Sequence, residues 1–576
     1  MSKTPNYDSA VKKILDQLVP GERTCALTGE KWFMTEEEIS WFKRFNVPPS
    51  PYSPRVRLWH NAAFYTVFQW WWNKHFYTSE PVLTYIHPAS GVRVLPDKEW
   101  FAKDFSEINL PYSAERSFFE IFSELYYAIP ANATANGKDP QNSIATVSLG
   151  DVDSYFVTGC RSKNCYYSID CLDSENSMDS SAGNNLSECL GISHSSRLSK
   201  CFFVFESYDC LNSSFLFDCR NCEYCFGATN QRNKKYLFFN KQLTKDAWKD
   251  EVAKINLGSY KELVEAKKRY IELVKNEAVW PDSFGDQTVN STGDYLNKCS
   301  DCQACFYGFN AHDNYYCYGV YEGSGNAFST VIPGSNNYQV LGVGSYNCRF
   351  CLQPQRSDDL EYCRNCYDCE HCFGCVGLYR KRFHIFNRPY EEDDYWQKVD
   401  ELKGKMLERG EYGRPIPMSL SSSYFPESGL VSYLGAELNQ WDITGIKKFD
   451  ASAEGAYGES RMVGKDVVKV DLLPDDIKDL NPDEWLKRPI ADPLTGRPFT
   501  LLKAEIDFYK KYNIAAPRRH FVSRMQELMS TMNTGWIEKT ACHACQKVTT
   551  VALNKTYRNK KTLCHDCYLK YLEENN

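Results

Sequence analysis

Four cysteines near the C-terminus have the spacing of a metal site. Two residues separate Cys542 from Cys545, and Cys564 and Cys567 repeat this spacing 18 residues further on. Two such pairs can supply the four corners of one tetrahedral ion, and the segment between them alternates like the strands of a hairpin. We therefore expect a zinc ribbon that holds one structural zinc ion per chain, because four thiolates leave no open position for catalysis.

A second set of cysteines recurs at every third residue in the middle of the chain. It comprises Cys363, Cys366, Cys369, Cys372 and Cys375, and Cys219, Cys222 and Cys225 repeat the rhythm. Iron–sulfur proteins use a related run, but in theirs the fourth cysteine follows after three residues and precedes a proline. An iron–sulfur cluster, a zinc site and small interior residues are the three interpretations of this ladder, and the mismatch favours interior residues.

The cysteine ladders belong to a sequence duplication. The segment 219–240 aligns without a gap with 366–387. Upstream of each copy, short apolar runs such as 201–205 recur between Asn, Asp, Gly and Ser, which are turn formers. Short strands with polar corners and small inward residues predict two parallel β-solenoids.

A second duplication relates the two ends of the chain. The segment 27–47 aligns without a gap with 494–514, and each copy places a Thr-Gly turn before a short helical pattern. Cys25, in front of the first copy, corresponds to Asp492. We therefore expect the N-terminal module to keep the fold without the metal.

These patterns predict a mainly β chain with helical insertions. Two duplicated parallel β-solenoids are flanked by small related terminal modules, and the C-terminal module ends in the zinc ribbon. A chain of 576 residues is too long for a single core. The expected segments are a degenerate zinc-finger-like module (1–100), a helix and linker (101–142), solenoid 1 (143–240), a helical hairpin and linker (241–298), solenoid 2 (299–388), a helix and irregular connector (389–476), and the C-terminal module (477–576).

Composition and charge limit the possible surroundings and partners. The chain is 43% hydrophobic and 24% charged, which is typical of a folded protein. The first residues lack the apolar run of a signal peptide, and no stretch has the roughly 20 apolar residues that span a bilayer. We expect a cytoplasmic protein with no membrane contact and reduced cysteines. A net charge of -7 excludes a surface shaped as a whole for nucleic acid.

The C-terminal segment is nevertheless basic. Residues 497–576 contain 14 Lys and Arg against 7 Asp and Glu. A local basic patch can bind phosphates, and an aromatic side chain within it can stack on a base. The candidate nucleic-acid contacts are Arg518, Arg519, Lys555, Tyr557, Arg558, Lys560 and Lys561. A solvated basic surface explains the same residues equally well.

Four stretches carry a resemblance to a known family. They are CEYCFGATNQRNKKYLFFN from Cys222, CEHCFGCVGLYRKRFHIFN from Cys369, LLPDDIKD from Leu472, and LTGRPFTLLKAEIDFYKKYNIAAPRRH from Leu494. With the C-terminal cysteine pairs, they resemble an uncharacterised family of cysteine-rich repeat proteins with terminal zinc-ribbon modules, from genomes of uncultured, reduced-genome (candidate phyla radiation) bacteria. The resemblance implies terminal zinc binding and no particular activity. The family's N-terminal cysteines are replaced here around Tyr52, Ser53 and Phe76.

The sequence favours a non-enzymatic, zinc-containing scaffold that binds a macromolecule, either nucleic acid or protein, in an oligomeric state that the sequence leaves open. One alternative is a carbohydrate-active enzyme of the β-helix type, an analogy of fold alone. Its candidate acids Asp170, Asp173, Glu175 and Asp179 are equally suited to turns. The other alternative is an iron–sulfur or redox protein that uses the ladder from Cys363 to Cys375.

Overall fold

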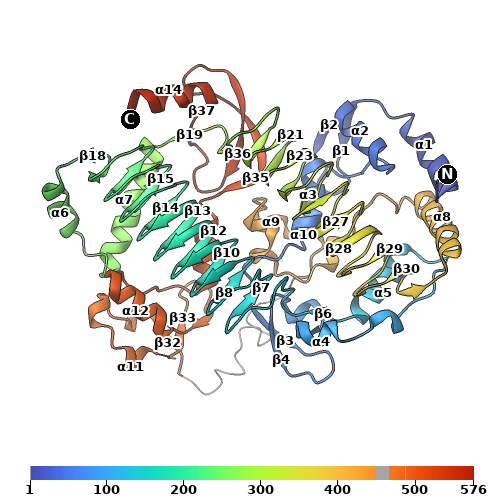
Figure 1. Cartoon of the computed structure of the whole chain (residues 1–576), viewed down its shortest axis with the longest axis horizontal. Coiled ribbons are helices and arrows are strands. Elements are labelled where there is room, and N and C mark those ends of the chain that lie inside the picture. The colour runs from blue at the N-terminus through green and yellow to red at the C-terminus, as the bar shows by residue number, and fades with distance from the viewer. Residues whose placement is uncertain (1, 114, 449–465, 487, 576) are drawn as a thin grey trace.

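Two stacks of mostly parallel strands form the centre of the molecule. The computed structural model describes residues 2–113, 115–448, 466–486 and 488–575. The first stack comprises β7 to β18 and the second comprises β20 to β31, and in each only the final strand pair is antiparallel. Figure 1 shows the two stacks side by side, with helices and small hairpins around them. The prediction of a β-rich chain with parallel sheets and some helices is confirmed.

The strands of the stacks are short. The first stack contains β7 (Ile144–Thr146), β8 (Tyr155–Thr158), β9 (Arg161–Lys163), β10 (Tyr166–Ile169), β11 (Leu172–Glu175), β12 (Met178–Ser187), β13 (Leu190–Ser199), β14 (Phe202–Phe205), β15 (Ser214–Phe217), β16 (Phe226–Thr229), β17 (Leu237–Phe238) and β18 (Lys241–Gln242). The second stack contains β20 (Gly293–Asn297), β21 (Ser300–Gln303), β22 (Cys305–Phe309), β23 (His312–Tyr315), β24 (Tyr318–Tyr321), β25 (Thr330–Val331), β26 (Gly334–Ser335), β27 (Leu341–Tyr346), β28 (Leu352–Glu361), β29 (Glu370–Phe373), β30 (Arg382–Ile385) and β31 (Arg388–Pro389). The second stack begins inside the predicted linker 241–298, because Leu296 already faces its buried interior.

A three-residue unit repeats along both stacks. Parallel partners in the first stack are typically 12 residues apart, as in the pair Leu190 and Phe202. A left-handed residue recurs at every third position, for example Asn221 (φ 52°) and Tyr224 (φ 53°). The residue after each of these two is a buried cysteine, Cys222 or Cys225. Asn and Asp tolerate the left-handed conformation, which explains why they so often precede a cysteine here.

Helices and hairpins surround the stacks. Before the first stack come α1 (Pro5–Leu15), β1 (Gly21–Thr24), β2 (Lys31–Met34), α2 (Glu36–Phe45), α3 (Pro54–Ala62), β3 (Trp71–Lys74), β4 (Pro81–Thr84), β5 (Val94–Leu95), α4 (Asp97–Phe101), α5 (Phe118–Ala128) and β6 (Ala131–Asn132). Between the stacks come α6 (Lys245–Ala253), α7 (Tyr260–Glu277) and β19 (Val279–Pro281). The Ser259 side chain caps α7 by accepting a hydrogen bond from the backbone N–H of Glu262.

The chain after the second stack returns to both stacks. It forms α8 (Glu392–Glu408), α9 (Gly429–Ser432), α10 (Trp441–Thr444), β32 (Val468–Lys469), α11 (Pro482–Trp485), β33 (Ile490–Ala491), β34 (Pro498–Phe499), α12 (Lys503–Tyr512), α13 (Phe521–Met529), β35 (Asn533–Ala541), β36 (Val548–Asn554), β37 (Lys561–Leu563) and α14 (His565–Asn575). Within the expected connector 389–476, residues 449–465 lie outside the described part. No helix in the described part of the chain is long and apolar enough to cross a membrane.

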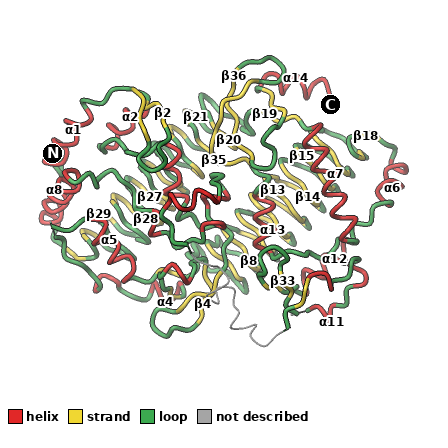
Figure 2. Tube along the Cα trace, turned by 180° about the vertical axis from the view of Figure 1, so that it is seen from behind, coloured by secondary structure: helices red, strands yellow, loops and turns green. Residues whose placement is uncertain are grey.

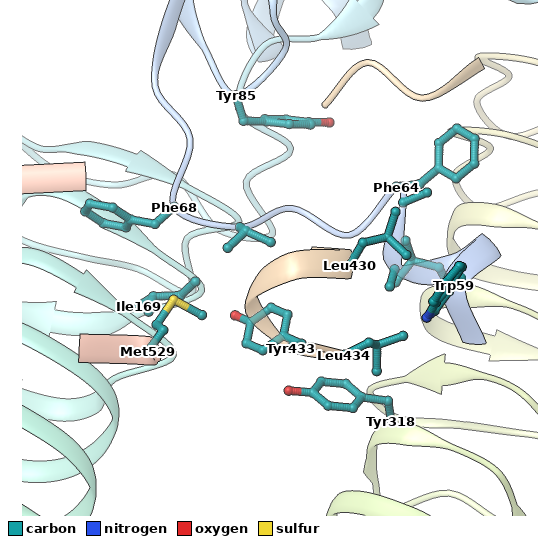
Figure 3. Packing of buried hydrophobic residues seen from close by; sticks show 14 of the residues in the cluster. Trp59, Phe64, Phe68, Tyr85, Ile169, Tyr318, Leu430, Tyr433, Leu434 and Met529 are labelled. Carbon is teal, nitrogen blue, oxygen red and sulfur yellow. The ribbon is translucent and has the colours of Figure 1, made fainter. Parts of the chain in front are cut away.

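The segment around α9 joins the two stacks. Figure 3 shows Tyr433 and Leu434 between Ile169 of the first stack and Tyr318 of the second. The Tyr433 hydroxyl donates to the Asp170 carboxylate at 3.1 Å, and its ring lies 5.3 Å from the Tyr318 ring. Burial raises the pKa of Asp170 to about 6. The Tyr433 side chain therefore contacts both stacks.

Candidate metal centre

The four C-terminal cysteines converge on one point. The Sγ atoms of Cys542, Cys545, Cys564 and Cys567 all lie within 4.8 Å of one another. The Sγ atoms of Cys545 and Cys564 are 3.7 Å apart, close to the edge of about 3.8 Å expected for a tetrahedron of thiolates around an ion about 2.3 Å away. These residues therefore fit one tetrahedral metal ion. The four cysteines predicted from their spacing therefore form one group that could hold a metal ion.

Two local structures bring the cysteines together. The turn between β35 and β36 carries Cys542, whose backbone N–H donates to the carbonyl of Lys547 at 2.9 Å. We call such a turn a knuckle, named by its first residue. Cys564 immediately precedes α14, and its N–H donates to the Cys542 Sγ at 3.3 Å. Burial opposes the thiolate of Cys542, but backbone N–H donors from Cys545, Cys564 and Ala544 outweigh it and lower its pKa to about 6.

The segment 533–575, which carries the four cysteines and is called the metal module, contacts the first stack and β19, the strand between the two stacks. β37 pairs in parallel with β19. The buried Asp218 carboxylate accepts a hydrogen bond from the Tyr568 hydroxyl of α14 and also pairs with Arg232 at 3.1 Å. Loss of the metal would therefore disturb a surface of the stack as well as the module.

Three further knuckles have the same backbone hydrogen bonds. The N–H of the first residue donates to the carbonyl five residues later in the Cys25 knuckle (2.8 Å), the His75 knuckle (2.8 Å) and the Asp492 knuckle (3.0 Å). In each, the fifth residue is left-handed, as Gln546 is in the metal module: Gly29 (φ 71°), Ser79 (φ 63°) and Gly496 (φ 70°). Each knuckle lies between two antiparallel strands. A helix later in the chain begins beside each knuckle: α3 for Cys25, α4 for His75 and α13 for Asp492.

The Asp492 knuckle has an ion pair where the Cys542 knuckle has four thiols. Its carboxylate accepts hydrogen bonds from the N–H groups of Leu494 (2.9 Å), Thr495 (3.1 Å) and His520 (2.8 Å), and pairs with Arg519 at 3.0 Å. His520 stands just before α13, as Cys564 stands just before α14. Burial alone would raise the pKa of Asp492, but these donors lower it.

The His75 knuckle uses a neutral acceptor and a carboxylate. His75 Nδ1 lies 3.3 Å from the N–H nitrogen of Tyr77 and 3.2 Å from that of Thr78, so it acts as an acceptor. His75 Nε2 then carries the proton and lies 3.1 Å from the Glu99 carboxylate. Glu99 is three residues beyond Pro96, the residue before α4, which is the position that Cys567 holds in the metal module.

The Cys25 knuckle keeps a single thiol. Burial raises the pKa of Cys25, but hydrogen bonds from the Thr28 hydroxyl and from the N–H groups of Ser53, Thr28 and Leu27 outweigh it and lower the pKa overall. Ser53 caps α3 and accepts from the N–H of Val56. Cys25 is 2% exposed, so its thiol is packed inside the module.

Sequence reasoning found the Cys25 and Asp492 knuckles through their duplication and missed the one at His75. The expected module 1–100 therefore contains two knuckles instead of one. The signal that was missed is a Thr three residues after the first residue of the knuckle, with Gly or Ser directly after it. It occurs at Thr28, Thr78 and Thr495. It is weak because the first residue changes from Cys to His to Asp.

The ladder cysteines are interior residues, as predicted. Cys363, Cys366 and Cys375 are fully buried and belong to one apolar cluster. The Cys363 Sγ donates to the carbonyl of Cys372 at 3.3 Å, and burial raises the pKa of the Cys363 thiol well above its usual value. Among the described residues, only the C-terminal four form a group of three or more side chains that could hold a metal.

The candidate nucleic-acid contacts do not share one exposed face. Arg518 and Arg519 line a cavity, where Arg518 donates to the carbonyl of Leu473 at 3.2 Å. Lys555 and Lys560 donate to backbone carbonyls within the fold, at 3.1 and 2.9 Å. The charges that face solvent are those of Arg558, which pairs with Glu437 at 3.0 Å, and Lys561.

Tyr557 does not have the role that the sequence suggested. Its side chain is 4% exposed, and its ring packs against Phe205 (5.9 Å) and Trp280 (5.4 Å). A ring covered in this way has no free face for a base, so the expectation of stacking by Tyr557 is wrong. The Tyr557 ring is instead part of the core between the first stack and the metal module.

Comparisons with known proteins add no function. No protein-family model matches the sequence, and no curated protein matches it. Among solved structures, the chain has a weak similarity to a "putative acetyltransferase" from Desulfovibrio desulfuricans G20, with 8% identity and a TM-score of 0.10 over 47% of this chain and 81% of that one. A likeness at this level carries no argument about fold or activity.

Proposed function

We propose that the protein is a non-enzymatic binding scaffold that contains structural zinc. Zinc is the metal most often held by four thiolates in short paired knuckles, and a site with four protein ligands has no open position for substrate. The expected contribution is stability, because metal binding to a small module is also folding free energy.

We also propose that each stack is a narrow β-solenoid. The 12-residue register and the left-handed residue at every third position support a coil with four short sides, each directing one small residue inward. The buried cysteines suit such an interior as small hydrophobic residues, and they share it with aliphatic side chains such as Val340 and Leu360. A rigid coil of this kind presents long flat faces to a partner.

A column of exposed apolar residues on the second stack carries the binding proposal. Phe309 on β22 pairs with Tyr321 on β24. Ile332 directly follows Val331, the partner of Val320, and Val343 directly follows Gly342, the partner of Val331. Their exposed fractions are 37%, 38%, 37% and 40%. Aligned apolar side chains on consecutive strands form a surface that is typical of contact with another protein.

Photocrosslinking tests this surface. A photoreactive phenylalanine analogue at Phe309 should give a discrete crosslinked product in the native cell, and one at Leu211, an equally apolar exposed site on the first stack, should not. Serine at both Tyr321 and Val343 should remove the product without changing thermal stability. Equal crosslinking at 309 and 211, or none at either, would contradict the proposal.

The second candidate partner of the scaffold is nucleic acid. The exposure of Arg558 and Lys561 favours it. Binding of RNA or DNA to the full-length protein should then weaken steeply between about 50 and 200 mM salt. Glutamate at both positions should flatten that dependence and leave the zinc content unchanged. Binding that is insensitive to salt would exclude phosphate contacts as its main source.

A further inference from the structure

A cavity of about 360 Å³ lies between the first stack and two helices. Its floor is formed by β13 and β14, which contribute Leu190, Phe203 and Phe205. Its walls are α7 on one side and α13 with the segment 514–519 on the other. Figure 2 shows both helices against the strands of the first stack. The volume lies within the range of small-molecule sites.

The rim of the cavity is apolar where it meets solvent. Val264 and Ile271 line it and are 45% and 37% exposed. They lie seven residues apart on α7, with Lys267 between them, so all three lie along one side of the helix. Exposed β-branched residues around an opening favour a ligand with an apolar body.

The acids that line the cavity are already paired. The Asp179 carboxylate forms two hydrogen bonds with Arg524, at 2.9 and 3.0 Å. Glu527 pairs with Arg519, which also binds Asp492. Arg518 lies over the Tyr260 ring at 4.3 Å and donates to backbone carbonyls. The lining therefore carries more positive than negative charge.

These pairs leave two of the lining cations without a carboxylate, Arg518, which backbone carbonyls hold, and Lys267. Its ammonium lies 4.3 Å from the centre of the Phe203 ring, and within the described residues it forms no hydrogen bond or ion pair. The Lys267 side chain reaches solvent at the opening, and desolvation by the surrounding protein lowers its pKa, an effect that Arg524 reinforces and that Asp179 and Glu527 oppose. An acidic group on a ligand would stabilise its charge.

We propose that this cavity binds a small organic anion with one acidic group on an apolar body, in which Lys267 holds the acid and the aromatic and aliphatic lining holds the rest. The apolar body would lie on Phe203, Phe205 and the α7 face. No residue of the apolar column and none of the four C-terminal cysteines lines the cavity, although Tyr557, which does, also packs between the first stack and the metal module.

Calorimetric titration of the zinc-loaded, full-length protein with decanoate tests the proposal. Decanoate should bind, and decanol, which has the same chain without the charge, should bind about tenfold more weakly, which corresponds to about 1.4 kcal/mol. Lys267→Gln should remove this difference. Lys268→Gln, at an exposed neighbour outside the cavity, should leave it intact.

Chemical labelling gives a second measurement. Decanoate should protect Lys267 from acylation and leave Lys268 reactive, as read by peptide mass spectrometry. Val264→Glu, which places a negative charge at the opening, should abolish binding without unfolding the protein. Equal affinity for decanoate and decanol, unchanged binding in Lys267→Gln, or no binding of decanoate would overturn the proposal.

Discussion

The Cys542 and Asp492 knuckles have the same backbone and different centres. In both, the side chain of the first residue accepts a hydrogen bond from the backbone N–H of the residue just before a helix. The distance is 3.3 Å from Cys564 to Cys542 and 2.8 Å from His520 to Asp492. In one, three more thiols complete a group that could hold a metal ion; in the other, Arg519 supplies the positive charge. The comparison teaches that this turn needs a buried acceptor at its first position, and that a metal is one of several ways to satisfy it.

Removal of a metal ligand should have the largest effect. Cys564→Ser should release about one zinc ion per chain and unfold residues 533–575, because metal binding is worth on the order of 10 kcal/mol in a module this small. Elemental analysis and hydrogen exchange measure both. Cys25→Ser is the matched control and should keep its zinc. A Cys564→Ser protein with full zinc content would refute the assignment.

Restoring the missing ligands should convert a metal-free knuckle into a metal site. Thr28, Ser53 and Val56 occupy the positions of Cys545, Cys564 and Cys567 relative to their turn and helix. The variant Thr28→Cys/Ser53→Cys/Val56→Cys should raise the zinc content from about one to about two ions per chain. The same variant with Cys25→Ser should bind the second ion far more weakly. Unchanged zinc content would show that the two turns differ in more than their side chains.

Neutralising Asp492 should cost about 3 kcal/mol of unfolding free energy, the lower range for breaking a buried ion pair. Because its folded pKa is lowered, Asp492 stabilises the protein above its unfolded value of about 3.9, and this contribution is lost as pH falls through the folded pKa. The gap between wild type and Asp492→Asn in urea unfolding should therefore narrow from pH 7 to pH 3. Asp507→Asn, at an exposed carboxylate of α12, should change little.

The thiol of Cys25 should matter least. Cys25→Ser keeps a small acceptor at the first position, so we expect a loss of about 1 kcal/mol and no change in zinc content. Differential scanning calorimetry measures the loss. A cost as large as that of Asp492→Asn would mean that the thiolate charge contributes to this knuckle, contrary to the comparison above.

The sequence was informative where one residue type carries the chemistry. The four cysteines of the metal centre follow from spacing alone, and α2 and α12 have equal lengths at the positions that the aligned ends predict. The His75 knuckle was not predictable in this way, because its partner Glu99 is 24 residues away and neither is a cysteine. Tyr557 was misassigned because Phe205 and Trp280, which cover it, come from distant strands.

The repeat within the stacks also sets the length of each stack in equal steps. Strands in a sheet are about 4.8 Å apart, so each step of the register lengthens a stack by that amount. The second stack uses steps of 11 residues between Val320 and Val331 and between Thr330 and Leu341, so one residue can be lost from a step without interrupting the ladder. Insertion of a whole step would move the two ends apart by a fixed distance and leave the rest of the interior unchanged. Duplication could therefore adjust the reach of this protein in discrete increments.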